Sequence, residues 1–264
     1  MPVTMISAKP AAQPATGNFR FIDIGGMQND ISFDFCQFAE AWLAVNLTDP
    51  VFRGYHHGRK KHDDDLEAML ERSRAAGVKS MIITGGSLHE SREALELAKQ
   101  FNFYATVGCH PTRSRQFDQF KGGPNAYLEE LDKLIEANLD GNGRVVAVGE
   151  CGLGLQLSLA KKHHLPLFLH SRAAHADFVS ILREEGFGED GGRGVGANGG
   201  VVHSFTGTAE EVTELMDMGF HISLNGCSLK TEANLAAAKA IRPDKIMFET
   251  GEYLTYGCGG GLAS

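Results

Sequence analysis

Short apolar runs alternate with helical repeats along most of the chain. A run of apolar, mostly β-branched residues such as 145–148 is typical of a strand buried on both faces of a parallel sheet. Between such runs, apolar residues recur at helical spacing. The expected strands lie at 19–25, 80–86, 103–111, 145–148, 165–169, 199–202, 220–226 and 245–250, and the expected helices at 63–76, 88–101, 125–138, 174–185, 210–218 and 231–241. This alternation predicts an α/β protein in which eight parallel strands close into a TIM-type (β/α)8 barrel.

Four segments do not follow the alternation. Residues 1–18 contain Ala, Pro and Thr without an apolar run, and they are expected to form a disordered tail. Residues 26–45 show no clean period and are interpreted as an insertion directly after the first strand. Residues 186–200 are rich in glycine and are expected to form a mobile loop. Residues 251–264 are also rich in glycine and have no helical pattern, so the barrel, at 19–250, is expected to lack its C-terminal helical region.

The composition narrows the possible classes of protein. The length of 264 residues is close to the roughly 250 typical of one such barrel. A net charge of -8 argues against binding nucleic acid by overall positive charge, although a local cationic or metal-lined cleft stays possible. Five cysteines without a CxxC pair indicate free thiols in a reducing compartment. Because neither a membrane span nor a secretory signal is visible, we expect a cytoplasmic or nuclear protein without membrane contact, with a monomer favoured.

Polar side chains follow three successive expected strands. Glu150 comes after the run at 145–148, His170 after 165–169, and His203 after 199–202. The carboxyl ends of parallel barrel strands meet at one mouth, so these side chains are expected to lie together. A buried carboxylate is costly unless a cation, a metal or a proton accompanies it. Carboxylate and imidazole ligands suit divalent metal ions, and the set therefore predicts a metal-dependent hydrolase site.

Each candidate also has a simpler interpretation. Glu150 could pair with an Arg or Lys, and His170 and His203 could be core imidazoles with ordinary hydrogen bonds. His110, at the end of the third expected strand, could line the cleft or merely cap the strand. Arg172 could hold a phosphate with its planar fork or form a structural ion pair.

A second cluster of metal-ligand residue types lies between His56 and Asp65. It contains His56, His57, His62, Asp63, Asp64 and Asp65. Acidic residues are favoured near the N-terminus of a helix, and a helix is expected from residue 63 onwards. We therefore interpret this cluster as the solvated start of a helix.

The candidate residues stand in motifs that resemble the TatD family of metal-dependent deoxyribonucleases, in particular its eukaryotic branch. The motifs are FIDIG near 19–25, NLTDPVFRG at 46–54, ITGGSLHES at 83–91, VGCHPTR at 107–113, VGECGL at 148–153, PLFLHSRAAHADF at 166–178, VVHSFTGT at 201–208, NGCSLKTEANL at 225–235 and KIMFET at 245–250. They occur in order over most of the chain. The resemblance implies a TIM-type barrel of the metal-dependent hydrolase kind that hydrolyses phosphodiester bonds of DNA, often as a 3′–5′ exonuclease.

The resemblance also assigns roles to residues of this chain. It implies two divalent cations, usually Mg²⁺, with Mn²⁺ or Zn²⁺ as other candidates. Glu150 is similar to the ligand that bridges the two ions, and His170 and His203 are similar to the other metal ligands. His110 corresponds to a residue of the cleft near the scissile phosphate, with a catalytic and substrate-binding role. Arg172 is the further candidate for binding the DNA substrate.

Three departures from the family pattern lower the activity that we expect. Residues 26–45 interrupt the first motif, and a loop with the first half of a helix is missing after 153. Gly251 stands where the family has an Asp that ligates metal. Such abrupt breaks between intact motifs resemble an alternatively spliced form. The alternatives are therefore a catalytically inactive isoform of the family, or a barrel hydrolase acting on small amides or phosphotriesters. The absence of a His-x-His motif and of a lysine after the fourth strand disfavours the latter.

Overall fold

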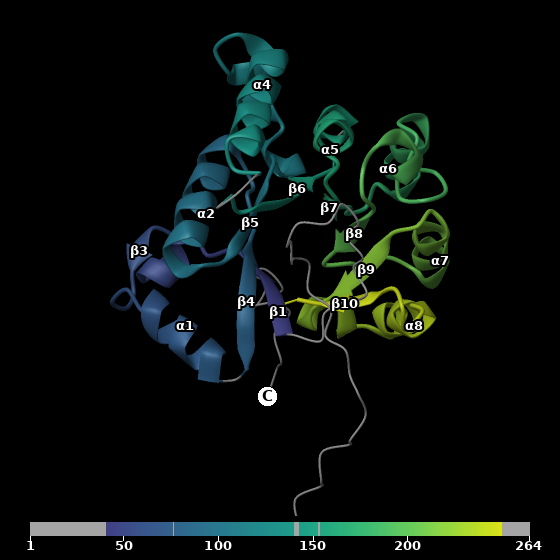
Figure 1. Cartoon of the computed structure of the whole chain (residues 1–264). Helices are drawn as coiled ribbons and strands as arrows, with labels where there is room; N and C mark the ends of the chain where they lie inside the picture. The colour runs from purple at the N-terminus through teal and green to yellow at the C-terminus, as the bar shows by residue number, and fades with distance from the viewer. Residues whose placement is uncertain (1–40, 76, 140–142, 153, 250–264) are drawn as a thin grey trace, which may run out of the picture.

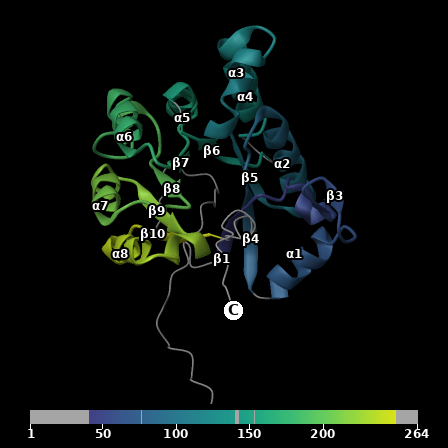
Figure 2. The same ribbon diagram turned by 180° about the vertical axis from the view of Figure 1, so that it is seen from behind.

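The computed structural model describes residues 41–75, 77–139, 143–152 and 154–249. Eight parallel strands form one sheet in the order β1-β4-β5-β6-β7-β8-β9-β10, so each strand lies beside its neighbours along the chain. They are β1 (Ala41–Val45), β4 (Val78–Ile83), β5 (Tyr104–Val107), β6 (Val145–Cys151), β7 (Leu167–His170), β8 (Gly200–His203), β9 (His221–Leu224) and β10 (Ile246–Phe248). The sheet curls, with its helices on the outside, as opposite views show (Figures 1 and 2). The TIM-type barrel fold is thus confirmed.

Helices follow the strands. They are α1 (Leu66–Ala75), α2 (Leu88–Phe101), α3 (Arg115–Gln119), α4 (Gly123–Glu136), α5 (Leu157–His163), α6 (His175–Glu184), α7 (Ala209–Asp217) and α8 (Glu232–Ala240). Three of them, α2, α7 and α8, begin at a side-chain cap. The hydroxyl of Ser87 accepts a hydrogen bond from the Glu90 amide at the start of α2, and Thr208 and Glu211 form a capping box at α7. In the described part of the chain, no helix is long and apolar enough to cross a membrane.

Shorter elements connect the barrel units. They are the 3-10 helices η1 (Pro50–Arg53), η2 (Pro111–Arg113), η3 (Gly154–Gln156), η4 (Arg193–Val195) and η5 (Gly226–Leu229), and the antiparallel pair of β2 (Tyr55–His56) with β3 (Arg59–Lys60). The apolar pattern does not predict α3 or this hairpin, because both are short and carry many polar residues.

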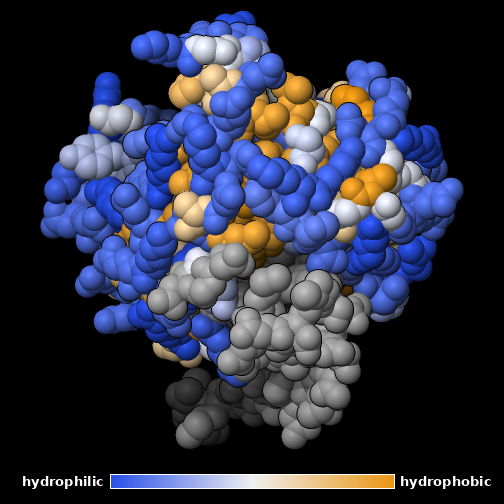
Figure 3. Space-filling view, turned by 45° about the horizontal axis from the view of Figure 1, so that its top comes forward, coloured by the Kyte–Doolittle hydropathy of each residue, from blue (hydrophilic) through white to orange (hydrophobic). Residues whose placement is uncertain are grey.

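In β7, successive residues belong to two different apolar clusters. Phe168 belongs to a small cluster with Ile82, Val146, Ala147, Val201 and Met247. Its neighbours Leu167 and Leu169 belong to the larger cluster between the sheet and the helices. This alternation fills the barrel interior with side chains, as is typical of such barrels, whose sites lie at the carboxyl ends of the strands. On the face shown in Figure 3, hydrophilic residues surround a smaller apolar area.

The first strand of the described sheet differs from the sequence expectation. Residues 41–45 form β1, which pairs with β4 in parallel from Ala41 to Val45, although 26–45 was interpreted as an insertion without a strand. The Thr84 amide also donates to the Val45 carbonyl at 3.0 Å. The segment Ala-Trp-Leu-Ala-Val is apolar throughout and leads directly into the 46–54 motif, which explains why it can occupy an edge of the sheet. The expected strand at 19–25, the tail at 1–18 and the segment 251–264 lie outside the described residues.

The glycine-rich segment before β8, which the sequence predicts to be a mobile loop, is packed onto the barrel. Phe187 is fully buried, and the amide of Gly191 donates to the Met218 carbonyl at 2.7 Å. The Asp190 carboxylate accepts hydrogen bonds from the amides of Gly192 and Gly194. The aromatic anchor and this local turn hold the segment in place despite its glycines.

Candidate metal centre

Four polar side chains gather where β5, β6, β7 and β8 end. His170 and His203 are the last residues of β7 and β8, and they stand opposite each other in the parallel register. His110 follows β5, as the N-cap of η2. Glu150 lies in an irregularity of β6, because Gly149 pairs with Phe168 but Cys151 already pairs with Leu169. Such a bulge re-aims a side chain, and here it places the Glu150 carboxylate among the imidazoles.

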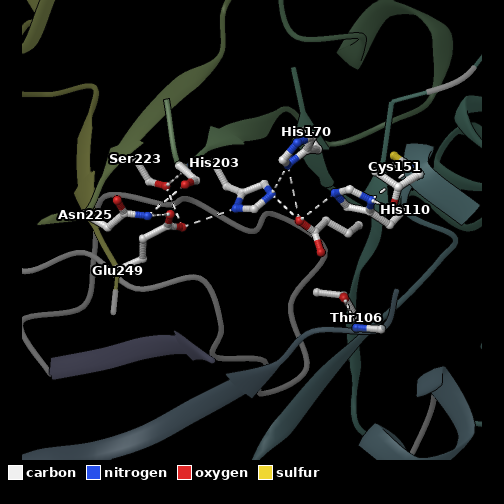
Figure 4. Close-up of polar contacts among 12 residues, drawn as sticks. Thr106, His110, Cys151, His170, His203, Ser223, Asn225 and Glu249 are labelled. Carbon is white, nitrogen blue, oxygen red and sulfur yellow. Dashed lines mark hydrogen bonds and ion pairs between the residues drawn. The ribbon is translucent and has the colours of Figure 1, made fainter. Parts of the chain in front are cut away.

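One carboxylate oxygen of Glu150 faces all three imidazoles. Its Oε1 lies 2.5 Å from His203 Nε2, 3.3 Å from His170 Nδ1 and 3.6 Å from His110 Nε2. His170 Nδ1 and His203 Nε2 are themselves 3.0 Å apart. The side chains of these four residues are only 12–19% exposed. The structure thus brings together the four residues that the strand ends predicted. The three histidines are labelled in Figure 4.

The four side chains differ in charge. Burial alone would raise the pKa of Glu150. His203, His170 and His110 lower it by more than burial raises it, so the pKa lies well below the usual range. Burial lowers the pKa of His203, but Glu150 and Glu249 raise it, to about 10. Burial also lowers the pKa of His110, to about 4, although Glu150 opposes this. At neutral pH, Glu150 is therefore an anion, His203 a cation and His110 neutral.

The geometry of this cluster fits a divalent cation. One ligand atom each from His110, Glu150 and His170 lie within 4.8 Å of one another. Two atoms that share an ion at about 2.1 Å are about 3 to 3.5 Å apart. Glu150 Oε1 lies at about this distance from His170 Nδ1 (3.3 Å) and His110 Nε2 (3.6 Å), whereas its 2.5 Å from His203 Nε2 is the distance of a direct hydrogen bond. The negative charge of Glu150, which raises the pKa of His203, would also favour a bound cation there. A carboxylate with several imidazoles suits Zn²⁺ and Mn²⁺ as well as Mg²⁺.

Glu249, just after β10, orients His203 from its other side, a role that the sequence analysis did not assign. Its Oε2 lies 3.5 Å from His203 Nδ1 and accepts a hydrogen bond from the Ser223 hydroxyl at 2.8 Å. Its Oε1 accepts from Asn225 Nδ2 at 2.9 Å (Figure 4). A carboxylate behind a histidine fixes the ring and its tautomer, here with Nε2 towards Glu150. The signal that could have found Glu249 is the one that found Glu150, an acidic residue at a strand end.

Thr112 orients His110 in a similar way. Its hydroxyl lies 2.7 Å from His110 Nδ1, and its amide donates to the same nitrogen at 3.2 Å. These contacts engage Nδ1 and leave Nε2 directed at Glu150.

The structure does not bring Arg172 into the cluster. Arg172 is exposed, two residues after His170 on the way to α6. In the described part of the chain its guanidinium is in no ion pair, so the alternative of a structural ion pair has no support there. Gly251, which the resemblance places where the family has an Asp ligand, lies outside the described residues.

Comparison with known proteins gives a family match over most of the chain. Residues 53–256 match the model of a family described as "TatD related DNase". "Deoxyribonuclease Tat-D" of Schizosaccharomyces pombe is 40% identical over 226 residues, covering 79% of this chain and 70% of that protein. "Uncharacterized metal-dependent hydrolase YabD" of Bacillus subtilis is 31% identical, covering 74% of this chain and 76% of that protein. "3'-5' ssDNA/RNA exonuclease TatD" of Cronobacter sakazakii is 33% identical, covering 79% and 76%.

Solved structures agree with these relatives. An uncharacterized amidohydrolase from Saccharomyces cerevisiae is 28% identical and superposes with a TM-score of 0.71, covering 80% of this chain and 75% of that chain. A hydrolase of the TatD family from Entamoeba histolytica is 31% identical with a TM-score of 0.67, covering 80% and 73%.

Proposed function

Because this chain belongs to the TatD-related deoxyribonuclease family, we propose that it hydrolyses phosphodiester bonds of DNA at the cluster around Glu150. The observation that carries the proposal is the convergence of three imidazoles on one carboxylate oxygen at the mouth of the barrel. Relatives in this family are named as deoxyribonucleases and as a metal-dependent hydrolase.

In the proposed reaction, Glu150, His170 and His203 hold divalent cations. Two Mg²⁺ are our first candidates, with Mn²⁺ or Zn²⁺ as the others, and Glu150 would hold both ions through its two carboxylate oxygens. Bound cations lower the pKa of a water and neutralise charge on a phosphate. The depressed pKa of Glu150 keeps it ionised and ready to bind without first losing a proton.

Two further residues act on the substrate in this proposal. His110 is neutral and directs Nε2 into the cluster, so it can exchange a proton beside the phosphate. Arg172, exposed at the mouth, can bind a phosphate of the DNA with its planar guanidinium. The name of the Cronobacter relative supports 3′–5′ exonuclease polarity for this chain as well.

The test is digestion of single-stranded oligonucleotides that carry a fluorescent label at either the 5′ or the 3′ end. With Mg²⁺ or Mn²⁺, a 3′–5′ exonuclease yields a ladder of shortened products from the 5′-labelled strand and releases labelled mononucleotide from the 3′-labelled strand. EDTA and the Glu150→Gln variant are expected to abolish both. Cleavage that persists in Glu150→Gln would contradict the proposal, since it would come from another site or a contaminant.

Gly251 bears on how much activity this chain retains. The family places a metal-ligating Asp there, so we expect weak activity in the native chain and a gain in the Gly251→Asp variant. Metal binding without cleavage in both proteins would favour an inactive member of the family. Cleavage of a phosphotriester in place of DNA would favour a small-molecule hydrolase.

A further inference from the structure

A buried glutamine holds the residue that precedes His110. Gln156, the last residue of η3, is fully buried. The Cys109 amide donates to Gln156 Oε1 at 2.7 Å, and Gln156 Nε2 donates to the Cys109 carbonyl at 2.8 Å. One side-chain amide thus satisfies both backbone groups of Cys109, as a neighbouring strand would.

These bonds fix the peptide group that joins Cys109 to His110. Its carbonyl accepts from Gln156, and its N–H, which belongs to His110, donates to the Gly86 carbonyl at 3.0 Å. The plane of a peptide is rigid, so two hydrogen bonds on opposite edges set its orientation. That orientation in turn sets the direction in which the His110 side chain leaves the backbone.

The connection from β6 to α5 packs tightly against the same region. A Cβ added at Gly152 would lie 2.6 Å from Pro111 Cγ and 2.7 Å from the His170 carbonyl oxygen. Gly152, directly after β6, therefore lies in close contact with the residue that follows His110 and with the end of β7. It links the placement of His110 to the strand that carries Glu150.

From these contacts we infer that Gln156 is a positioning residue of the metal centre, acting through the Cys109–His110 peptide. Only a side chain with one donor and one acceptor on the same planar group can serve both backbone groups of one residue. A carboxylate would only accept, and an apolar side chain would do neither. The inference rests on the proposed function in that it places His110 in a metal centre, but its structural half can be tested without metal.

The test compares Gln156→Met and Gln156→Glu with Asn138→Ala. Asn138 is also buried, and its side-chain amide Nδ2 donates a hydrogen bond to the Leu134 carbonyl at 2.9 Å. The backbone carbonyl of Asn138 accepts a hydrogen bond from the Val145 amide. Val145 begins β6, so this contact lies at the end of the barrel opposite the mouth. Asn138→Ala is therefore expected to change stability without changing the centre. Circular dichroism and thermal unfolding establish which variants fold. Gln156→Glu places a carboxylate against the Cys109 carbonyl in a fully buried position, so the uncharged Gln156→Met, of similar size, is expected to be the milder change.

The metal-free readout is the long-range ¹H–¹⁵N spectrum of the histidine rings. The signal of His110 is assigned by its loss in His110→Gln. We expect it to shift or broaden in both Gln156 variants and to stay in place in Asn138→Ala. An unchanged His110 signal in the folded Gln156 variants would overturn the inference, whether or not the protein binds metal.

The second readout is the affinity for Mn²⁺, measured by calorimetry. His110 lies 3.6 Å from Glu150 Oε1 in the centre, so displacing it in Gln156→Met is expected to weaken Mn²⁺ binding by about the 10-fold typical when a residue outside the ligands is lost. If Gln156 acts through His110, the loss disappears when His110→Ala is already present. An equal loss in both backgrounds would overturn the role through His110. Failure of the wild type to bind Mn²⁺ would contradict the proposed function, while the spectra would still decide the role of Gln156.

Discussion

Two regions of the chain are rich in metal-ligand residue types, and only one of them has the form of a site. The Glu150 cluster, made of His110, Glu150, His170 and His203, comes from four strand ends spread over the sequence, and its side chains are 12–19% exposed. The 56–65 segment gathers its residues within one stretch of sequence, at the hairpin and before α1. There the His62 side chain is 38% exposed and that of Asp63 is 99% exposed.

The partners of the carboxylates differ in the same way. In the 56–65 segment, Asp63 pairs with Lys60 and Asp64 pairs with Arg53, while Asp64 also accepts from the Leu66 amide at the start of α1. These are the contacts of a solvated helix start, as the sequence predicted. In the described part of the chain, the ion pairs of Glu150 are all with imidazoles. Convergence and burial, more than closeness in sequence, make a metal centre.

The largest expected effect is the loss of metal binding in Glu150→Gln. Mutating a residue that only supports a metal ligand weakens metal binding by up to about 100-fold. Because Glu150 Oε1 faces all three imidazoles, its loss should weaken Mn²⁺ binding by more than this. Asp64→Asn, the same change at an exposed carboxylate, should leave the affinity unchanged. Calorimetric titration measures both. Similar affinities in the two variants would remove the distinction between the regions.

A smaller effect is expected at the carboxylate behind His203. Glu249→Gln keeps the size of the side chain but removes the charge next to His203 Nδ1, and an outer partner of this kind is worth about 10-fold in affinity. Glu214→Gln is the matched control, because Glu214 Oε2 lies 2.8 Å from His175 Nε2 on α6, in a pair outside the cluster. A larger loss in Glu214→Gln than in Glu249→Gln would show that the orientation of His203 is not what matters.

The pH dependence of the metal-free protein should report the charge of the cluster. The pKa of His203 is raised from 6.5 to about 10 in the fold, so the folded state binds its proton more tightly than the unfolded chain. This stabilisation is complete below pH 6.5 and is lost as the pH rises through 10. Thermal unfolding in EDTA should therefore show a falling midpoint between these values, and a weaker fall in His203→Gln. Parallel curves for the two proteins would refute the raised pKa.

The smallest effect is expected in the 56–65 segment. His56 Nε2 and His62 Nε2 lie 3.0 Å apart, but they are exposed and their contacts are screened by water. Replacing either by Ala should change stability by less than about 1 kcal/mol, the range of exposed polar pairs. Chemical unfolding and Mn²⁺ titration check this. A 10-fold change in Mn²⁺ affinity would show that this segment takes part in metal binding after all.

Much of the fold and the first layer of the site could be predicted because each depends on local pattern. Buried parallel strands are apolar along their length, so β4 to β10 of the main sheet stand near their expected positions, and α2 matches its range of 88–101. The strand-end rule found His110, Glu150, His170 and His203. The apolar pattern did not predict β1 at 41–45, because this segment follows a stretch without periodicity.

The residues behind the ligands could not be predicted in the same way. Gln156 contacts Cys109 across 47 positions, and Glu249 contacts Ser223 across 26. Their roles depend on which segments the fold brings together. Thr112 is close to His110 in sequence, but its role depends on the turn of η2, which the apolar pattern does not specify.

The most direct test of a metal centre at Glu150 is thermal unfolding of the purified protein with and without Mg²⁺ or Mn²⁺. A ligand that binds only the folded state raises the midpoint in proportion to the logarithm of its concentration. We predict such a rise in the wild type and its absence in Glu150→Gln. A cooperative transition in the wild type whose midpoint does not move at millimolar concentrations of either ion would contradict the account.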